Sequence, residues 1–107
     1  MKVLLDEMLP IGVRQLLPGH EVVTAAYAGL AGVSNGEMIS QAMSKGFDVI
    51  VSLDRGIPNQ QNLDRYGIGF ILIRHNDTDL IRDYAGELLD AIANMTPGLV
   101  VRIPHTG

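Results

Sequence analysis

The chain contains no cysteine, which excludes disulfides, thiolate nucleophiles and cysteine-ligated zinc or iron–sulfur centres in a single step. Any metal that this protein binds must therefore be held by oxygen or nitrogen ligands. The lack of cysteine also fits a reducing compartment, and we expect the protein to be cytoplasmic.

Aromatic residues and positive charges are scarce. Three tyrosines and two phenylalanines are scattered along 107 residues, so they do not predict a stacking platform for single-stranded nucleic acid. Eight lysines and arginines stand against twelve aspartates and glutamates, which gives a net charge of −4. The overall field therefore disfavours nucleic acid, and any polyanion would have to be held at a local site.

No apolar run approaches the roughly 20 residues that a membrane-spanning helix needs. The first residues follow a strand pattern rather than the basic and apolar pattern of a leader peptide. No linker, repeat or low-complexity tract divides the sequence. We therefore expect a single soluble domain over residues 1–107 that makes no contact with a membrane.

Buried-strand patterns and helical patterns alternate along the chain. Strands are expected at 2–5, 20–24, 49–53, 68–73 and 99–103, and helical segments at 9–17, 34–46, 79–94 and briefly within 57–66. A capping box at 34–37 begins the second helix. Because parallel neighbours require crossovers, this alternation predicts an α/β fold, a three-layer sandwich around a mainly parallel five-stranded sheet. The expected strand order is about 2-1-3-4-5.

Two of the apolar strands run directly into carboxylates, because Asp6 follows the first strand and Asp54 follows the third. The carboxyl ends of parallel strands meet at one rim, and the expected order reverses between these two strands, which opens a crevice there. Two acids placed in this way can converge on a divalent cation. Alone, each acid is better explained as a helix cap or a turn residue. Taken together, the two acids fit a charged functional site as well as they fit two separate structural roles.

Other polar residues are expected near the same rim. Glu37 stands at the third position of the capping box, where a structural glutamate belongs. Arg55, Arg74 and Arg102 would either hold phosphates or pair with the acids, and the sequence favours neither. Asn59 begins an amide cluster at 59–62 that could bind bases, backbone or metal-bound water, or cap a short helix.

The sequence shows no Ser–His–Asp arrangement and no phosphate-binding glycine motif. His75 is followed by Asp77 and Asp79, which resembles a metal-binding cluster. A helix N-cap within 77–79 is the simpler interpretation.

Several segments resemble, in the same order, a small family of PIN-like domains, which are stand-alone bacterial relatives of PIN nucleases and are often regarded as toxin components. The matching segments are MKVLLDEMLP at 1–10, LPGHEV at 17–22, NGE at 35–37, FDVIVSLDR at 47–55 and QQNL at 60–63. The resemblance covers about the first three quarters of the chain. It implies that Asp6, Glu37 and Asp54 are catalytic and together bind Mg²⁺ or Mn²⁺. On this basis Glu37 is expected to be a ligand rather than only a structural residue, and Glu7 is at most an auxiliary one.

The expected function is a divalent-metal-dependent endoribonuclease, the toxin of a toxin–antitoxin pair. The metal would lower the pKa of a water molecule for in-line attack on a phosphodiester. Arg55, Arg74 and Asn59 are the expected substrate-binding residues. The expected partners are RNA, a cognate antitoxin protein and a second copy of the chain in a homodimer.

Two alternatives stay open. Met8 stands where similar sequences have a polar residue, Asn35 stands where many have aspartate, and no further acid follows Asp54. These departures favour a catalytically impaired domain that binds a protein partner. A phospho-receiver domain also has acids after its first and third strands, but it would need a serine or threonine after the fourth strand and a lysine after the fifth. Arg74 and Arg102 occupy those places.

Overall fold

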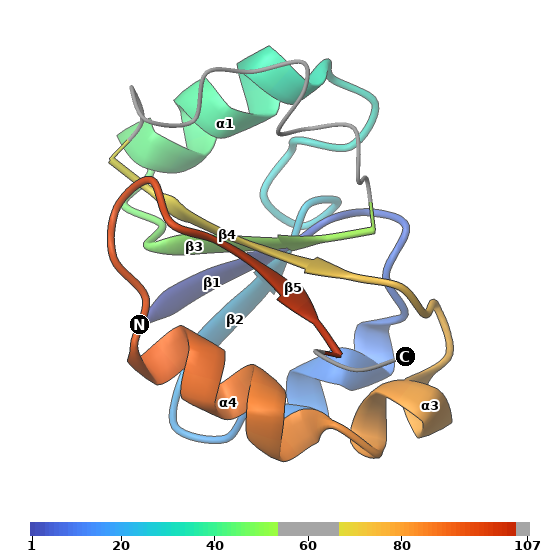
Figure 1. Ribbon diagram of the computed structural model, residues 1–107. Coiled ribbons are helices and arrows are strands. Elements are labelled where there is room, and N and C mark those ends of the chain that lie inside the picture. The colour runs from blue at the N-terminus through green and yellow to red at the C-terminus, as the bar shows by residue number, and fades with distance from the viewer. Residues whose placement is uncertain (54–66, 105–107) are drawn as a thin grey trace.

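The computed structural model describes residues 1–53 and 67–104 and has three layers, with one sheet between two layers of helices (Figure 1). The sheet order is β2-β1-β3-β4-β5, and every pair of neighbours is parallel. The strands are β1 (Lys2–Leu5), β2 (Glu21–Thr24), β3 (Val49–Ser52), β4 (Gly69–Ile73) and β5 (Val100–Ile103). The predicted fold class and strand order are confirmed.

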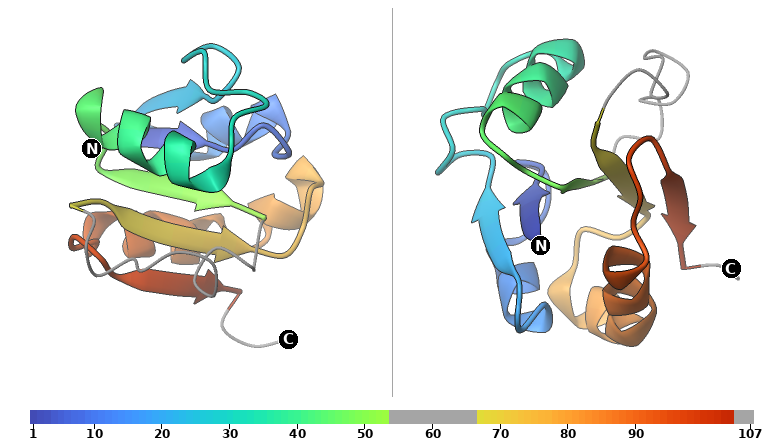
Figure 2. Two further views of the ribbon diagram at one scale, coloured as in Figure 1. Left: turned by 90° about the horizontal axis from the view of Figure 1, so that it is seen from above. Right: turned by 90° about the vertical axis from the view of Figure 1, so that its left-hand side faces the viewer.

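Helices cover both faces of the sheet, as the second view in Figure 2 shows from the side. One face is covered by α1 (Asn35–Ser44). The other is covered by the 3₁₀ helix η1 (Ile11–Leu16) together with α3 (Thr78–Arg82) and α4 (Ala85–Ala93). Within the described ranges, no helix is long and apolar enough to cross a membrane.

The two cores follow the period of two along each strand, which sends successive side chains to opposite faces. The core on the α4 side includes Val3, Leu5, Val49, Val51, Ile71 and Ile73 from the sheet. The core on the α1 side includes Leu4, Ile50 and Phe70. Every residue of β3 and β4 is buried, because both faces of these strands are covered.

Both ends of α1 have the features that the sequence predicts. At its start the Glu37 N–H donates to Ser34 Oγ at 3.3 Å, which satisfies one free amide of the first turn. At its end Gly46 adopts a φ of +83°, the left-handed conformation that costs glycine least. The Phe47 N–H then donates to the Ala42 carbonyl at 3.0 Å and closes the helix.

Two helical predictions need correction. The segment predicted as a helix over 9–17 forms only the 3₁₀ helix η1, which lacks a side-chain cap at its start. The helix predicted over 79–94 is broken into α3 and α4, because Tyr84 leaves the helical conformation with φ −121° and ψ 28°. The Tyr84 N–H bonds to a carbonyl three residues earlier, that of Ile81, which ends α3. The short helix expected within 57–66 lies outside the described residues.

Candidate metal-binding rim

The carboxyl ends of the strands lie at one rim of the sheet, on the right in Figure 1. The strand order reverses between β1 and β3, because the chain goes from β1 through η1 to β2 on one side and returns through α1 to β3 on the other. The topology from which the site was predicted is therefore confirmed. A crevice is expected where the strand order reverses. Helix α1 runs opposite to the strands, so its N-terminal turn lies at the same end of the molecule (Figure 1).

Asp6 is held at this rim, where the strand order reverses, by Ser52, the last residue of β3. The Ser52 hydroxyl donates to Asp6 Oδ2 at 2.6 Å, and the Asp6 N–H donates to the Val51 carbonyl at 3.0 Å. Among the described residues, Ser52 is the polar residue that is fully buried. Asp6 is half-buried. A carboxylate has about four lone-pair positions, so a single serine bond leaves it able to bind a cation.

The interpretation of Asp6 as the cap of the following helix is wrong. The residue that precedes η1 is Pro10, and η1 has no side-chain cap. The turn after β1 is closed by the backbone, since the Leu9 N–H donates to the Asp6 carbonyl at 3.0 Å. The carboxylate of Asp6 is therefore directed to Ser52 rather than to a helix terminus.

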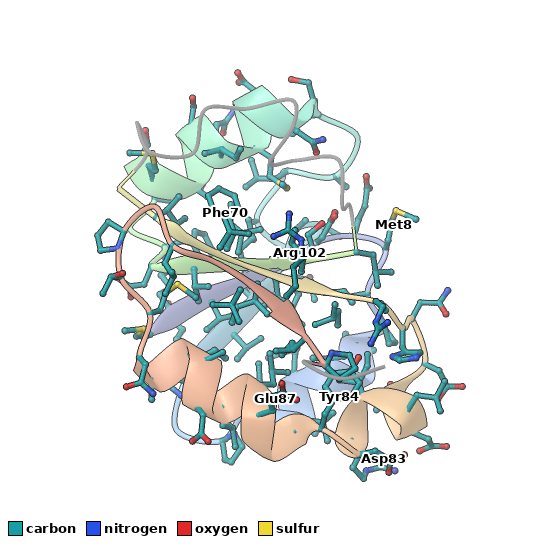
Figure 3. The ribbon with its side chains drawn as sticks, viewed as in Figure 1. Met8, Phe70, Asp83, Tyr84, Glu87 and Arg102 are labelled. Atoms are coloured by element: carbon teal, nitrogen blue, oxygen red, sulfur yellow. The ribbon has the colours of Figure 1, made fainter. Side chains whose placement is uncertain are left out.

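The register of the sheet places Arg102 in the same row and on the same face as this carboxylate. Ser52 pairs with Leu72, and Leu72 pairs with Arg102, so the row crosses from β1 to β5. Three strand intervals separate the ends of the row, which puts the Cα atoms of Asp6 and Arg102 about 14 Å apart. In Figure 3 the Arg102 side chain rises from β5 on the side that faces α1.

The guanidinium of Arg102 is exposed and forms no hydrogen bond or ion pair with any residue that the structure describes. The row thus has a carboxylate at one end and, at the other, a cation that has no partner among the described residues. An arginine guanidinium can donate bidentate hydrogen bonds to a phosphate group.

Glu37 lies at the third position of α1, at the rim end of that helix. Its side chain is exposed, and Oε1 accepts a hydrogen bond from Gln41 Nε2 at 2.7 Å. The carboxylate therefore bonds along the helix, while the backbone N–H of Glu37 makes the capping bond.

The third predicted ligand, Asp54, lies outside the described residues, as do the predicted substrate-binding residues Arg55 and Asn59. Over 1–53 and 67–104, no group of three or more histidines, aspartates and glutamates is arranged to hold a metal ion. The three-acid site with Asp6 and Glu37 thus stays a prediction.

Arg74 lies at the rim as predicted, just after β4, and one of its contacts is with the end of β5. Its Nη2 donates to the Pro104 carbonyl at 3.4 Å, beyond the end of β5. Its charge also acts on Tyr84, on the α4 side of the sheet. The register of the sheet places Arg102 on the face of Asp6. The sequence placed Arg102 near the rim but could not select it, because the register across three strands is not visible in a sequence.

A second polar group joins the loop after β4 to α4. His75 Nδ1 and the Tyr84 hydroxyl lie 3.1 Å apart, and their ring centroids lie 5.7 Å apart. The pKa of Tyr84 is raised, chiefly by burial; the charge of Arg74 lowers this pKa in part, the charge of Glu87 adds to the rise, and a hydrogen bond with the His75 backbone lowers it. The contact lies at the residue that separates α3 from α4.

The aspartates that follow His75 have the structural role that the sequence favoured. Asp77 is the N-cap of α3, and its Oδ1 accepts from the N–H groups of Asp79 and Leu80 at 2.8 and 3.3 Å.

Glu7 and Met8 lie beside Asp6 on the loop after β1. Glu7 Oε1 accepts from the Gly32 N–H at 3.3 Å, so this carboxylate connects the loop to the segment that follows β2. Met8 is 63% exposed and projects from the rim (Figure 3).

Comparison with protein-family models, curated proteins and solved structures gives no match.

Proposed function

We propose that this protein is a divalent-metal-dependent endoribonuclease whose site lies at the β1–β3 crevice, with Asp6, Glu37 and Asp54 as the ligands of Mg²⁺ or Mn²⁺. The observation that supports this most strongly is the bond from the buried Ser52 hydroxyl to Asp6 at the point where the strand order reverses. The resemblance to PIN-like domains supports the choice of ligands and of RNA as substrate.

The Ser52 contact suits a metal ligand because a ligating carboxylate must be held in one orientation. Outer hydrogen bonds to metal ligands do this in known sites, and their loss weakens metal affinity about 10–100-fold. The donor set is also suitable, since Mg²⁺ prefers carboxylate oxygens and keeps several of its waters, so that few protein ligands are needed. A bound metal would supply a water activated for attack and would neutralise charge that develops on phosphate.

The residues of the chain have separate tasks in this proposal. Asp6, fixed by Ser52, defines the position of the cation relative to the sheet. Arg102 donates hydrogen bonds to the phosphate backbone from the other end of the row, and Arg55, Arg74 and Asn59 are further candidates for RNA contacts. Because the net charge is −4, RNA binding is confined to this local site. The absence of cysteine fits action in the cytoplasm.

The test is cleavage of mixed single-stranded RNA in the presence of Mn²⁺. We expect wild type to cleave, and both Asp6→Asn and Asp54→Asn to lose at least about 100-fold in rate because each removes a ligand charge. Asp90→Asn, an exposed substitution on α4 far from the rim, serves as the matched control and should retain full activity. Equal cleavage by wild type and Asp6→Asn would remove the proposal, since it would identify the activity as a contaminant.

A second candidate is a catalytically impaired domain that binds a protein partner, such as a cognate antitoxin or a second copy. Met8 favours it, because an apolar side chain that is 63% exposed beside the crevice would be covered by such a partner. Calorimetric titration with Mn²⁺ separates the two functions. Heat of binding that disappears in Asp6→Asn supports the enzyme, and no heat in wild type supports the binding module.

A further inference from the structure

The outer edge of β2 differs from the rest of the described surface in shape, apolar exposure and charge. β2 is the last strand on its side of the sheet and pairs only with β1. The N–H groups of Glu21 and Ala25 donate to carbonyls on the β1 side, at 3.1 and 2.8 Å. In a parallel ladder, every second residue directs its N–H and carbonyl groups away from the neighbouring strand. The N–H and carbonyl groups of Val22 and the N–H of Thr24 therefore face the open edge.

A groove of about 860 Å³ runs along this edge, between η1 and the segment after β2. A second hollow of about 470 Å³ adjoins it on the η1 side. Tyr27 and Ile11 line the larger groove and are 87% and 66% exposed, the highest values among the large apolar side chains that the structure describes. Two exposed apolar side chains beside an unpaired sheet edge indicate a contact surface.

The charge of the groove is opposite to that of the protein. Lys2, Arg14 and Lys45 line it together with a single acid, Glu21, which gives three positive charges against one negative. The whole chain has a net charge of −4, so three of its eight cations gather at one edge. Glu21 is a weak partner for them, because its carboxylate lies 3.9 Å from Lys2 Nζ and is mostly exposed.

We propose that this groove binds an extended acidic segment of a partner protein, which adds to the sheet as a sixth strand beside β2. Its backbone would bond to the outward peptide groups at Val22, and its alternate side chains would lie on opposite faces of the strand. Apolar side chains of the segment would cover Ile11 and Tyr27, and its acidic side chains would lie near Arg14 and Lys45. The negative surface elsewhere on the protein would direct an acidic segment to this edge.

Two other occupants are less suitable. A symmetric dimer would join the same patch of two copies, which would bring two positively charged grooves together. RNA would use the cations but neither the outward peptide groups nor the two apolar side chains. Both remain outcomes of the test below, and the groove proposal does not depend on the nuclease proposal.

The probe is an eight-residue peptide of alternating glutamate and valine, with acetylated and amidated ends, added to isotope-labelled full-length protein without metal. We expect amide shifts concentrated at residues 11–14, 21–28 and 45–47 in the NMR spectrum, with weaker binding at high salt. Arg14→Glu should weaken the apparent affinity at least about 10-fold, because a like charge then faces the acidic peptide. Arg82→Glu, the same reversal on α3, should leave it unchanged.

Two further peptides test the mode of binding. The same sequence with alternate amides methylated should not bind if strand pairing is required, and an alternating lysine and valine peptide should bind more weakly than the acidic one. Absence of shifts at millimolar peptide, or equal binding by Arg14→Glu, would overturn the proposal. It would also be overturned by a wild-type dimer that Tyr27→Arg abolishes, or by single-stranded RNA shifting these amides more strongly than the peptide does. Failure of the nuclease proposal would appear only in the cleavage assay.

Discussion

Replacing Ser52 with alanine removes the hydroxyl that orients Asp6 while changing the packing of β3 very little. The side chain is fully buried, and alanine occupies nearly the same volume, so the cost of a cavity is small. A hydrogen bond to a charged group contributes about 1.5–3 kcal/mol. Because Asp6 is half-buried, water can replace part of this bond, and we expect the lower part of that range, about 1.5–2 kcal/mol.

Urea denaturation followed by circular dichroism measures this loss, which for a domain of this size corresponds to a fall in Tm of roughly 6–16 °C. Ser40→Ala, an exposed substitution in α1, is the control and should stay within about 0.5 kcal/mol of wild type. A double-mutant cycle with Asp6→Asn assigns the loss to this pair, and we expect a coupling of about 1 kcal/mol or more. If Ser52→Ala were as stable as wild type, the bond would not hold Asp6, and the structural basis for the metal site would be lost.

Three further outcomes are expected. Gly69→Ala should lower the free energy of unfolding by about 1–3 kcal/mol, because the new Cβ would overlap the methionine side chain packed over it. Burial raises the pKa of Tyr84, so the folded state keeps this proton above pH 10 where the unfolded chain releases it. The resulting stability is complete below pH 10 and is lost as the pH rises from there through the folded pKa, so Tyr84→Phe should lose less stability than wild type as the pH rises above 10. Arg102→Gln should slow RNA cleavage at least about 10-fold with little change in stability, because the guanidinium has no described partner.

Each outcome has its own control. Gly67→Ala should be mild, since its Cβ would meet only the Met43 methyl group at 3.6 Å, and equal effects at both glycines would contradict the overlap at Gly69. A Tyr84→Phe protein whose alkaline stability curve matches that of wild type would show that the buried phenol does not titrate as described. Arg82→Gln should leave cleavage unchanged, and an equal loss in both arginine variants would indicate a nonspecific effect of charge.

The strands were predictable because both faces of the central sheet are buried. Residues 49–52 and 69–73 are therefore apolar almost without interruption, and such runs are easy to recognise. The break at Tyr84 was not predictable, since the helical spacing of apolar residues continues through it. At the break the Tyr84 side chain contacts His75, and a tertiary contact of this kind is not visible in the sequence.

The candidate site was predictable only in part. The position of Asp6 at the rim follows from the strand that precedes it and from the order of the strands. Its bond to Ser52 joins residues 46 positions apart, and the place of Arg102 depends on the register of three strands, neither of which a sequence displays. Glu37 was located at the start of its helix by the capping motif, but its role was inferred from resemblance alone.

Thermal unfolding with and without Mn²⁺ tests the metal site most directly. At a concentration of about 100 times Kd, a cation bound only by the folded state adds about 2.7 kcal/mol of stability. In a domain of 107 residues this should raise the Tm by roughly 11–22 °C. We expect the increase in wild type and in Asp90→Asn, and its loss in Asp6→Asn. An equal increase in Asp6→Asn, or none in wild type at millimolar Mn²⁺, would contradict the assignment of Asp6 as a metal ligand.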